Sequence, residues 1–178
     1  PDLQQNGGLD DLLRTANFGS EPIQRLRELR AAQPQGPLCN MEFWIGWFDA
    51  WGALTGKSFR DPSDVAKTLR ETLDAGASVN FFVFHGGTSF GFCGSGGNIS
   101  SVGLYEPQVT SYDYGGLLDE AGEVTEKYLK CREILAAFFA ETGAFGDKFS
   151  CISQATRITA FGTGRIHVFG RCFARNDT

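Results

Sequence analysis

A glutamate surrounded by aromatic side chains is the strongest candidate for chemistry in this sequence. Glu42 lies in residues 40–52, a stretch that holds all three tryptophans of the chain and two phenylalanines. The apolar run Pro37-Leu38-Cys39 leads into it. This order predicts a buried strand with a carboxylate near its C-terminal end, where parallel α/β sheets and barrels place their chemistry. An aromatic-walled carboxylate suits a sugar, because sugar C–H faces stack on indoles while hydroxyl groups need charged acceptors.

The alternative is that Glu42 is a surface acid at a strand end, which is the commoner fate of a glutamate. Its neighbours Phe43, Trp44 and Trp47 argue against a solvated face. A buried carboxylate without a partner would cost several kcal/mol. The pattern therefore favours a functional carboxylate.

The elements that must position this glutamate follow the order strand, helix, strand, helix, strand, loop, helix. The predicted strands are residues 15–19, 37–43 and 78–84, and the predicted helices are residues 21–33, 61–75 and 123–140. Residues 78–84 form an apolar run typical of a strand covered on both faces. Residues 85–121 form a long loop rich in glycine and aromatics, and loops of that length are usually functional. This order is expected of three consecutive βα units of a (β/α)8 barrel.

Local signals set the limits of the predicted helices. Ser20 is the expected N-cap of the first helix, with Pro22 in its first turn. The second helix repeats apolar residues every four positions and should end at Gly76. The third carries one apolar seam, formed by Val124, Tyr128, Cys131, Leu135 and Phe138.

At these residues a family resemblance becomes visible. The string Glu42-Phe-Trp-Ile-Gly-Trp-Phe-Asp-Ala-Trp-Gly52, preceded by Pro37-Leu38, resembles the nucleophile segment of the family 35 glycoside hydrolases, the retaining β-galactosidases. The similarity continues in residues 76–80, 85–91, 107–114 and 125–128. It implies that residues 1–150 are the C-terminal part of a TIM-barrel catalytic domain, about its last three βα units. Residues 151–178 are then an unassigned tail, for which the sequence allows a β-hairpin around Gly162-Thr-Gly164.

The resemblance also implies roles for five side chains. Glu42 would be the nucleophile of a retaining double displacement that hydrolyses terminal β-D-galactose residues. Trp47, Asn80 and Tyr114 would line the galactose pocket. Phe82 stands where the family usually has a tyrosine whose hydroxyl contacts the sugar. No metal or cofactor is implied, and the expected ligands are β-galactoside sugars.

Two other residues of the nucleophile segment receive minor roles. Asp49 is expected to be a hydrogen-bond partner within the site rather than a second catalyst. Trp51 is expected to be structural.

A retaining glycosidase needs a second carboxyl group, the acid/base, about 5–5.5 Å from the nucleophile. In the family this glutamate lies in an Asn-Glu-Tyr segment several strands earlier, and these 178 residues contain no such segment. We therefore expect little hydrolysis by the chain alone, unless Glu106 or Glu120 substitutes for the acid. The expected partner is the missing N-terminal part of the barrel or a second copy of the chain. The alternative is a non-catalytic galactose-binding module.

One competing motif belongs to another class of enzyme. Gly87-Thr-Ser89-Phe-Gly91 fits Gly-x-Ser-x-Gly, and Asp113 or Asp147 and then His167 follow in the chain order of an α/β-hydrolase triad. The nucleophile elbow of that fold requires a helix directly after the serine. Residues 90–97 are poor helix formers, so a serine esterase using Ser89 is the less favoured hypothesis.

Bulk properties exclude several other classes. The net charge is −5 and no Lys/Arg cluster occurs, which argues against nucleic acid as a partner. No apolar run approaches the length of a membrane span. Five cysteines without Cys-x-x-Cys spacing and two histidines, His85 and His167, argue against a metal site. The first residues contain no signal-peptide core, and the sequence does not predict a compartment.

Overall fold

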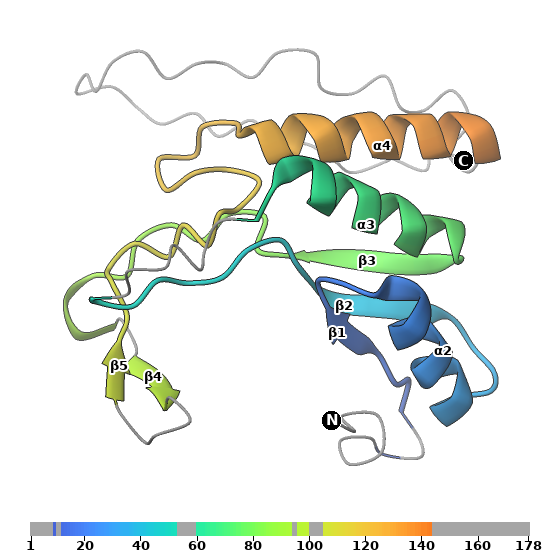
Figure 1. Cartoon of the computed structure of the whole chain (residues 1–178), viewed down its shortest axis with the longest axis horizontal. Helices are drawn as coiled ribbons and strands as arrows, with labels where there is room; N and C mark the ends of the chain where they lie inside the picture. Colours follow the sequence, from blue (N-terminus) through green and yellow to red (C-terminus); the bar gives the residue numbers. More distant parts are fainter. Residues whose placement is uncertain (1–8, 10–11, 53–59, 94–95, 100–104, 144–178) are drawn as a thin grey trace, which may run out of the picture.

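The computed structural model describes residues 9, 12–52, 60–93, 96–99 and 105–143 (Figure 1). This part of the chain is an α/β protein with a small parallel sheet. Its main elements are β1 (Ala16–Phe18), α2 (Pro22–Ala32), β2 (Leu38–Trp44), α3 (Pro62–Asp74), β3 (Ala77–Phe82) and α4 (Glu126–Thr142). The predicted boundary at residue 150 and the predicted tail over 151–178 lie outside the described residues.

The strand that carries Glu42 is the central one. The three strands run parallel in the order β1-β2-β3. Phe43 of β2 pairs with Phe18 of β1 and with Phe81 of β3. Buried Asn40 ties the strands further, because its Nδ2 donates to the carbonyl of Phe18 at 3.0 Å. Since parallel strands end at one edge of a sheet, the segments that follow β1, β2 and β3 meet beside Glu42.

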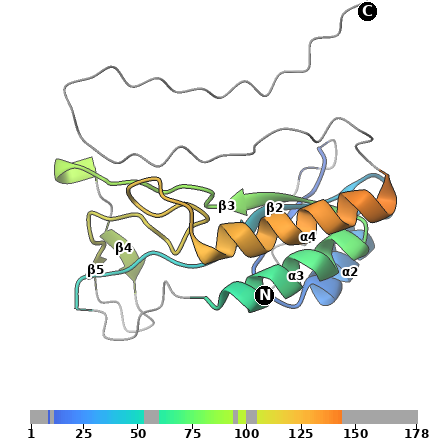
Figure 2. The same cartoon turned by 90° about the horizontal axis from the view of Figure 1, so that it is seen from above.

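All the described helices that contact the sheet pack on one of its faces. Ala77, Val79 and Phe81 share a face of β3 because side chains alternate along a strand. Ala77 packs in the cluster formed with α2, whereas Val79 and Phe81 pack against the cluster formed with α3. Figure 2 shows α2, α3 and α4 on the same side of the strands.

The opposite face of the sheet differs from the prediction of strands covered on both faces. Ser78 and Asn80 of β3 are exposed, and Met41 of β2 is 50% exposed. The physical reason is that the described helices all lie on the other side. We call this surface, formed by Cys39, Met41, Ser78 and Asn80, the open face.

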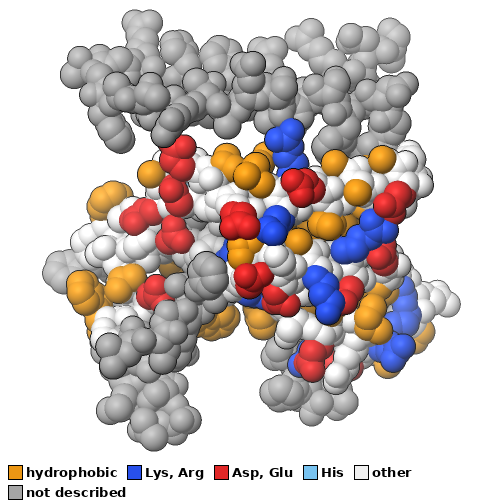
Figure 3. Space-filling view, turned by 45° about the horizontal axis from the view of Figure 1, so that its top comes forward, with side chains coloured by type: hydrophobic (Ala, Val, Ile, Leu, Met, Phe, Trp, Pro, Cys, Tyr) orange, Lys and Arg blue, Asp and Glu red, His pale blue; other side chains and the backbone are white. Residues whose placement is uncertain are grey.

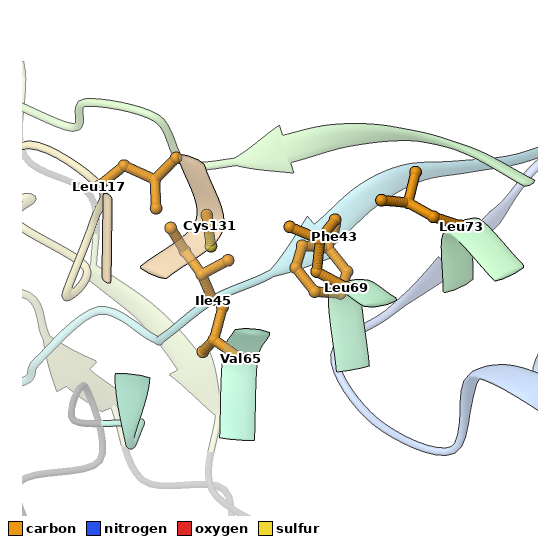
Figure 4. Close-up of a cluster of buried hydrophobic side chains, with 7 residues drawn as sticks. All are labelled: Phe43, Ile45, Val65, Leu69, Leu73, Leu117 and Cys131. Carbon is orange, nitrogen blue, oxygen red and sulfur yellow. The ribbon is translucent and has the colours of Figure 1, made fainter. Parts of the chain in front are cut away.

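The core lies between β2, α3 and α4 (Figure 4). The predicted repeat of Val65, Leu69 and Leu73 is confirmed, since all three are buried there with Phe43 and Ile45. The predicted seam of the last helix is confirmed at four positions that reach the same core, Tyr128, Cys131, Leu135 and Phe138. Its fifth member, Val124, precedes the helix and is 37% exposed.

Helix starts depend on capping, and two of them differ from prediction. Asp61 caps α3 by accepting from the amides of the two residues after Pro62. Ser20 does not cap α2. Glu21 is the N-cap, with a left-handed φ of 54° and no side-chain cap, and its carboxylate pairs with Arg25 instead. Proline tolerates the first helical position because it has no N–H to satisfy, so the helix begins at Pro22.

The last helix begins three residues later than predicted, because Thr125 is its N-cap and accepts from the amide of Tyr128. The predicted loop over 85–121 contains a short antiparallel pair, β4 (Gly96–Ile99) and β5 (Tyr105–Pro107).

Charged side chains of both signs alternate on the face seen in Figure 3. Over α3 and α4 they form ion pairs, which include Arg70 with Glu141 at 2.6 Å and Lys130 with Glu126 at 3.5 Å. Among the described helices, none combines the length and the apolar composition that a bilayer crossing requires.

Candidate active site

Glu42 and Trp44 form the centre of the site. Both lie near the C-terminal end of β2, and the indole Nε1 of Trp44 donates a hydrogen bond of 2.9 Å to Oε2 of Glu42. Phe43 and Ile45 turn into the core, so alternation along the strand directs Glu42 and Trp44 away from it. The Glu42 side chain is therefore half-buried and already holds one charge-assisted hydrogen bond. The sequence pattern alone predicts no role for Trp44.

An aromatic cluster surrounds this pair, formed by Trp44, Trp47, Phe48, Phe82, Tyr112 and Tyr114. Its ring centroids lie 5.9 Å apart for Trp44 and Trp47, and 6.0 Å apart for Trp47 and Tyr114. Tyr114 is further flanked by Phe82 at 5.4 Å and by Tyr112 at 5.5 Å. These are normal separations for edge-to-face and offset-stacked rings. The end of β2 with the residues after it, the end of β3, and the segment after β5 thus bring their aromatic rings into one cluster.

The two phenols of this cluster are electrostatically linked to the carboxylate. Burial raises the pKa of Tyr114, and nearby Tyr112 and Glu42 raise it further. The pKa of Tyr112 is raised by burial first and then by Glu42. Both phenols therefore stay protonated at neutral pH, and each can donate a hydrogen bond to an anion or a sugar oxygen. Tyr112 is a site residue that the sequence analysis did not select.

Of the five predicted site residues, four come together. Glu42 interacts with both phenols, and Trp47, Phe82 and Tyr114 are in ring contact. Asn80 shares the face of β3 that carries Phe82, as its spacing predicts. It is exposed, and its Nδ2 donates at 3.0 Å to the carbonyl of Met41, the residue before Glu42. Asn80 is thus described in contact with the backbone of β2 rather than with the aromatic cluster, and the roles of all five residues remain predictions.

A tight turn presents Tyr114 to the site. Tyr114 has a left-handed φ of 62°, which is uncommon for a bulky residue. Asp113 fixes the turn, since its Oδ1 accepts from the amide of Gly115 at 2.9 Å and its Oδ2 from the amide of Glu120 at 3.0 Å. The Tyr114 side chain is only 3% exposed as a result.

Backbone hydrogen bonds join the segment after β3 to the segment that carries Tyr112. The amide of Tyr112 donates to the carbonyl of Gly87 at 2.8 Å, and the amide of Ser89 donates to the carbonyl of Thr110 at 2.7 Å. A Cβ built on Gly86 would collide with the carbonyl of Tyr112. A side chain at position 86 is thus incompatible with the placement of Tyr112.

Glu120 is close enough to this loop to be considered as a second carboxylate. It accepts hydrogen bonds from Thr88 and Ser111, and these lower its pKa. A general acid requires a raised pKa so that it carries a proton at neutral pH. Glu120 is therefore ionised and poorly suited to protonate a leaving group. The side chain of Glu106, the other candidate acid, lies outside the described residues.

Other predicted residues are placed as follows. Ser89 is followed by a single 3₁₀ turn over Gly91–Cys93 rather than by the helix that a nucleophile elbow requires. Asp147 and His167 lie outside the described residues. Trp51, expected to be structural, is 68% exposed. The described residues contain no group of three His, Cys, Asp or Glu side chains suited to a metal ion.

Comparisons with known proteins assign the sequence to a family. The model of the family described as Glycosyl hydrolases family 35 matches residues 1–138. Beta-galactosidase of Bos taurus is 42% identical over 138 residues, which is 76% of this chain and 20% of that protein. Beta-galactosidase of Mus musculus is 41% identical over 134 residues, with coverage of 74% and 20%. Beta-galactosidase-1-like protein 2 of Homo sapiens is 39% identical over 133 residues, again with coverage of 74% and 20%.

The chain thus spans about a fifth of the length of these relatives. The family match itself covers most of the chain and includes every described residue of the site. The chain belongs to glycosyl hydrolase family 35.

Proposed function

We propose that this chain supplies the nucleophile half of a retaining β-galactosidase-type glycoside hydrolase, with Glu42 as the nucleophile. The observation that carries the proposal is the setting of this carboxylate. It lies near the C-terminal end of the central parallel strand, accepts from the indole of Trp44, and lies close to two protonated phenols. The names of the relatives support β-galactosides as the substrate class.

The fold part of the proposal is that β1, β2 and β3 are about the last three strands of a (β/α)8 barrel. Two features support it. Among the described residues the helices lie on one face of the sheet only, as they do around a barrel, and the other face carries Asn80 and Met41. The open face would then be part of the barrel interior. The remaining strands would come from the N-terminal part of the barrel or from another copy of the chain.

In the proposed reaction Glu42 attacks the anomeric carbon as the bond to the leaving-group oxygen breaks. The product is a glycosyl ester, which water then hydrolyses with retention of configuration. Trp44 holds Oε2 and leaves the other carboxylate oxygen for attack. The phenols of Tyr112 and Tyr114 donate hydrogen bonds as the charge redistributes. We expect the acid/base carboxyl group to come from outside the described residues, because the 178 residues contain no Asn-Glu-Tyr segment and the lowered pKa of Glu120 does not suit that role.

The test is covalent labelling. A 2-deoxy-2-fluoro-β-galactoside with a good leaving group would be incubated with the chain. It would also be incubated with a graft in which residues 12–138 replace the matching segment of one of the longer relatives. Peptide mass spectrometry should place the label on Glu42 in the graft. The label should be absent from a Glu42→Gln variant and present in a Glu120→Gln control. Labelling of another carboxylate would contradict the assignment.

A non-catalytic galactose-binding module is the second candidate, and the ionised state of Glu120 favours it for the chain alone. Titration calorimetry with galactose separates the two. Binding that survives Glu42→Gln, together with a graft that cannot be labelled or turn over a nitrophenyl galactoside, would support the binding module.

A further inference from the structure

A buried ammonium group links the two segments that flank Glu42. Lys127, in the first turn of α4, is only 4% exposed. Its Nζ donates at 2.8 Å to the carbonyl of Ile45 and at 2.8 Å to the carbonyl of Gly115. Ile45 directly follows Trp44, and Gly115 directly follows Tyr114. One side chain thus ties the residue after the indole donor to the residue after the phenol.

A second cation holds the neighbouring carbonyl. Nη1 of Arg60 donates at 2.8 Å to the carbonyl of Trp44. The rest of the guanidinium is itself fixed, by Asp64 at 2.9 Å and by Thr68 at 2.8 Å. A Cβ on Gly19 would lie 2.6 Å from the carbonyl oxygen of Trp44. The backbone that follows β1 therefore packs closely against the backbone of Trp44. The backbone of Trp44 and Ile45 therefore has little freedom.

The opposite segment also needs external support. Tyr114 and Gly115 have φ values of 62° and 60°. A left-handed conformation at a bulky residue is strained and persists only where the surroundings impose it. Asp113 supports this turn from within, and Lys127 supports it from α4.

Burying an ammonium group is unfavourable, and a lysine that only anchored a helix could be replaced by an apolar residue. Burial lowers the pKa of Lys127, as does nearby Arg60, while Asp113 opposes the change. The cation is thus kept in an unfavourable setting at the point where the two segments meet.

We infer that Lys127 is a positioning residue for the nucleophile: together with Arg60 it holds the indole of Trp44 and the phenol of Tyr114 in register with Glu42. This inference rests on the proposed role of Glu42. Lys127 contacts the backbone carbonyls of Ile45 and Gly115 and acts through Trp44 and Tyr114, the residues that directly precede them.

The test uses the full chain labelled with ¹⁵N in its tryptophan indoles. Three tryptophans give three indole signals, so the spectrum remains readable in an assembly. Trp44→Phe assigns the signal of Trp44, and Glu42→Gln shows where that signal lies without the charged acceptor. Lys127→Met removes the ammonium group at nearly constant length. We expect the Trp44 signal to move toward its Glu42→Gln position and its indole proton to exchange about tenfold faster or more.

The matched control is Phe138→Ala, which weakens the packing of the same helix far from both carbonyls. When Phe138→Ala and Lys127→Met are compared under conditions that give them equal free energies of unfolding, Phe138→Ala should leave the Trp44 signal unchanged. An unchanged Trp44 signal in folded Lys127→Met would overturn the inference. So would an equal change in Phe138→Ala, because stability alone would then explain the effect.

A second variant covers the case in which Lys127→Met does not fold. Arg60→Met removes the donor to the Trp44 carbonyl, together with the guanidinium contacts to Asp64 and Thr68, and leaves both hydrogen bonds of Lys127 in place. The Trp44 signal should therefore move while the alkaline titration of the Tyr114 phenol is retained. A Trp44 signal that stays in place would contradict the inference. These spectra need no sugar. The spectra can therefore contradict the role of Lys127 while the fluorosugar still labels Glu42. The labelling can equally contradict the role of Glu42 while the spectra agree with the role of Lys127.

Discussion

The indole nitrogen of Trp44 lies 2.9 Å from a carboxylate oxygen of Glu42, two residues earlier on the same strand. Alternation along β2 explains this pairing, because Phe43 between them turns into the core and pairs with both neighbouring strands. The triplet Glu-Phe-Trp therefore does two things at once. It anchors the central strand, and it supplies the carboxylate with its hydrogen-bond donor.

Removing this donor should slow the proposed chemistry. A hydrogen bond to a charged group contributes about 1.5–3 kcal/mol, so Trp44→Phe should reduce the labelling rate of Glu42 in the graft by roughly 10- to 100-fold. The rate is followed by mass spectrometry of the labelled peptide. Trp51→Phe is the control, since this ring is 68% exposed and its loss should have little effect. Equal rates in the two variants would show that the indole hydrogen bond does not support the nucleophile.

The raised pKa of Tyr114 predicts a loss of stability at alkaline pH. The folded chain holds the phenol proton more tightly than the unfolded chain does, so this contribution is complete below pH about 10 and is lost as the pH rises further. At pH 11 the loss for one phenol is at most about 1.4 kcal/mol. Denaturant melts at pH 9 and 11 should show a smaller loss in Tyr114→Phe than in the unchanged chain. Identical losses would mean that Tyr114 is accessible to hydroxide when folded.

The sequence predicted the parts of this site that depend on periodicity. The three strands and the core positions Val65, Leu69 and Leu73 follow from apolar repeats that any packed βα unit must satisfy. Contacts made to backbone carbonyls were not predictable in this way. Lys127 and Arg60 are ordinary charged residues in the sequence, and only the tertiary arrangement brings them to consecutive carbonyls.

The open face was also missed, for a related reason. An apolar strand indicates that both faces can be covered, but it does not specify which chain covers them. The apolar sequence of β3 shows that the strand can be buried, while the positions of α2 and α3 decide which of its two faces is covered.

Two glycine substitutions should differ sharply in effect. In Gly86→Ala the new Cβ meets the backbone carbonyl of Tyr112, which cannot move without displacing the phenols from Glu42. Gly122 has open space around it and a φ of 89°, so Gly122→Ala should cost only about 1–2 kcal/mol of backbone strain. Thermal stability, measured in melts, and the labelling rate of Glu42 should both fall further in Gly86→Ala than in Gly122→Ala. A Gly86→Ala variant as active as Gly122→Ala would mean that the loop can move without harm.

The cap of α4 should stabilise the turn that presents Tyr114. Thr125 accepts from the amide of Tyr128, and its hydroxyl reaches the carbonyls of Gly116 and Leu117 at 3.1 and 2.8 Å. Thr125→Ala should lower the free energy of unfolding by about 0.5–2 kcal/mol. Thr142→Ala, at the exposed end of the same helix, is the control and should change it less. Equal effects in urea melts would argue against a link between the cap and the turn.

The open face should make the isolated chain self-associate. β1 and β3 are the edges of the described sheet, and the exposed Met41 and Asn80 lie on its uncovered side. Unpaired strand edges beside apolar side chains favour pairing with another chain. Size-exclusion chromatography with light scattering should detect oligomers, and Met41→Lys should reduce them because a buried charge is costly. Ile23→Lys, on a helix and 42% exposed, should not. A monomer with a sharp cooperative melt would contradict the prediction, because the face would then have to be covered by residues of the same chain.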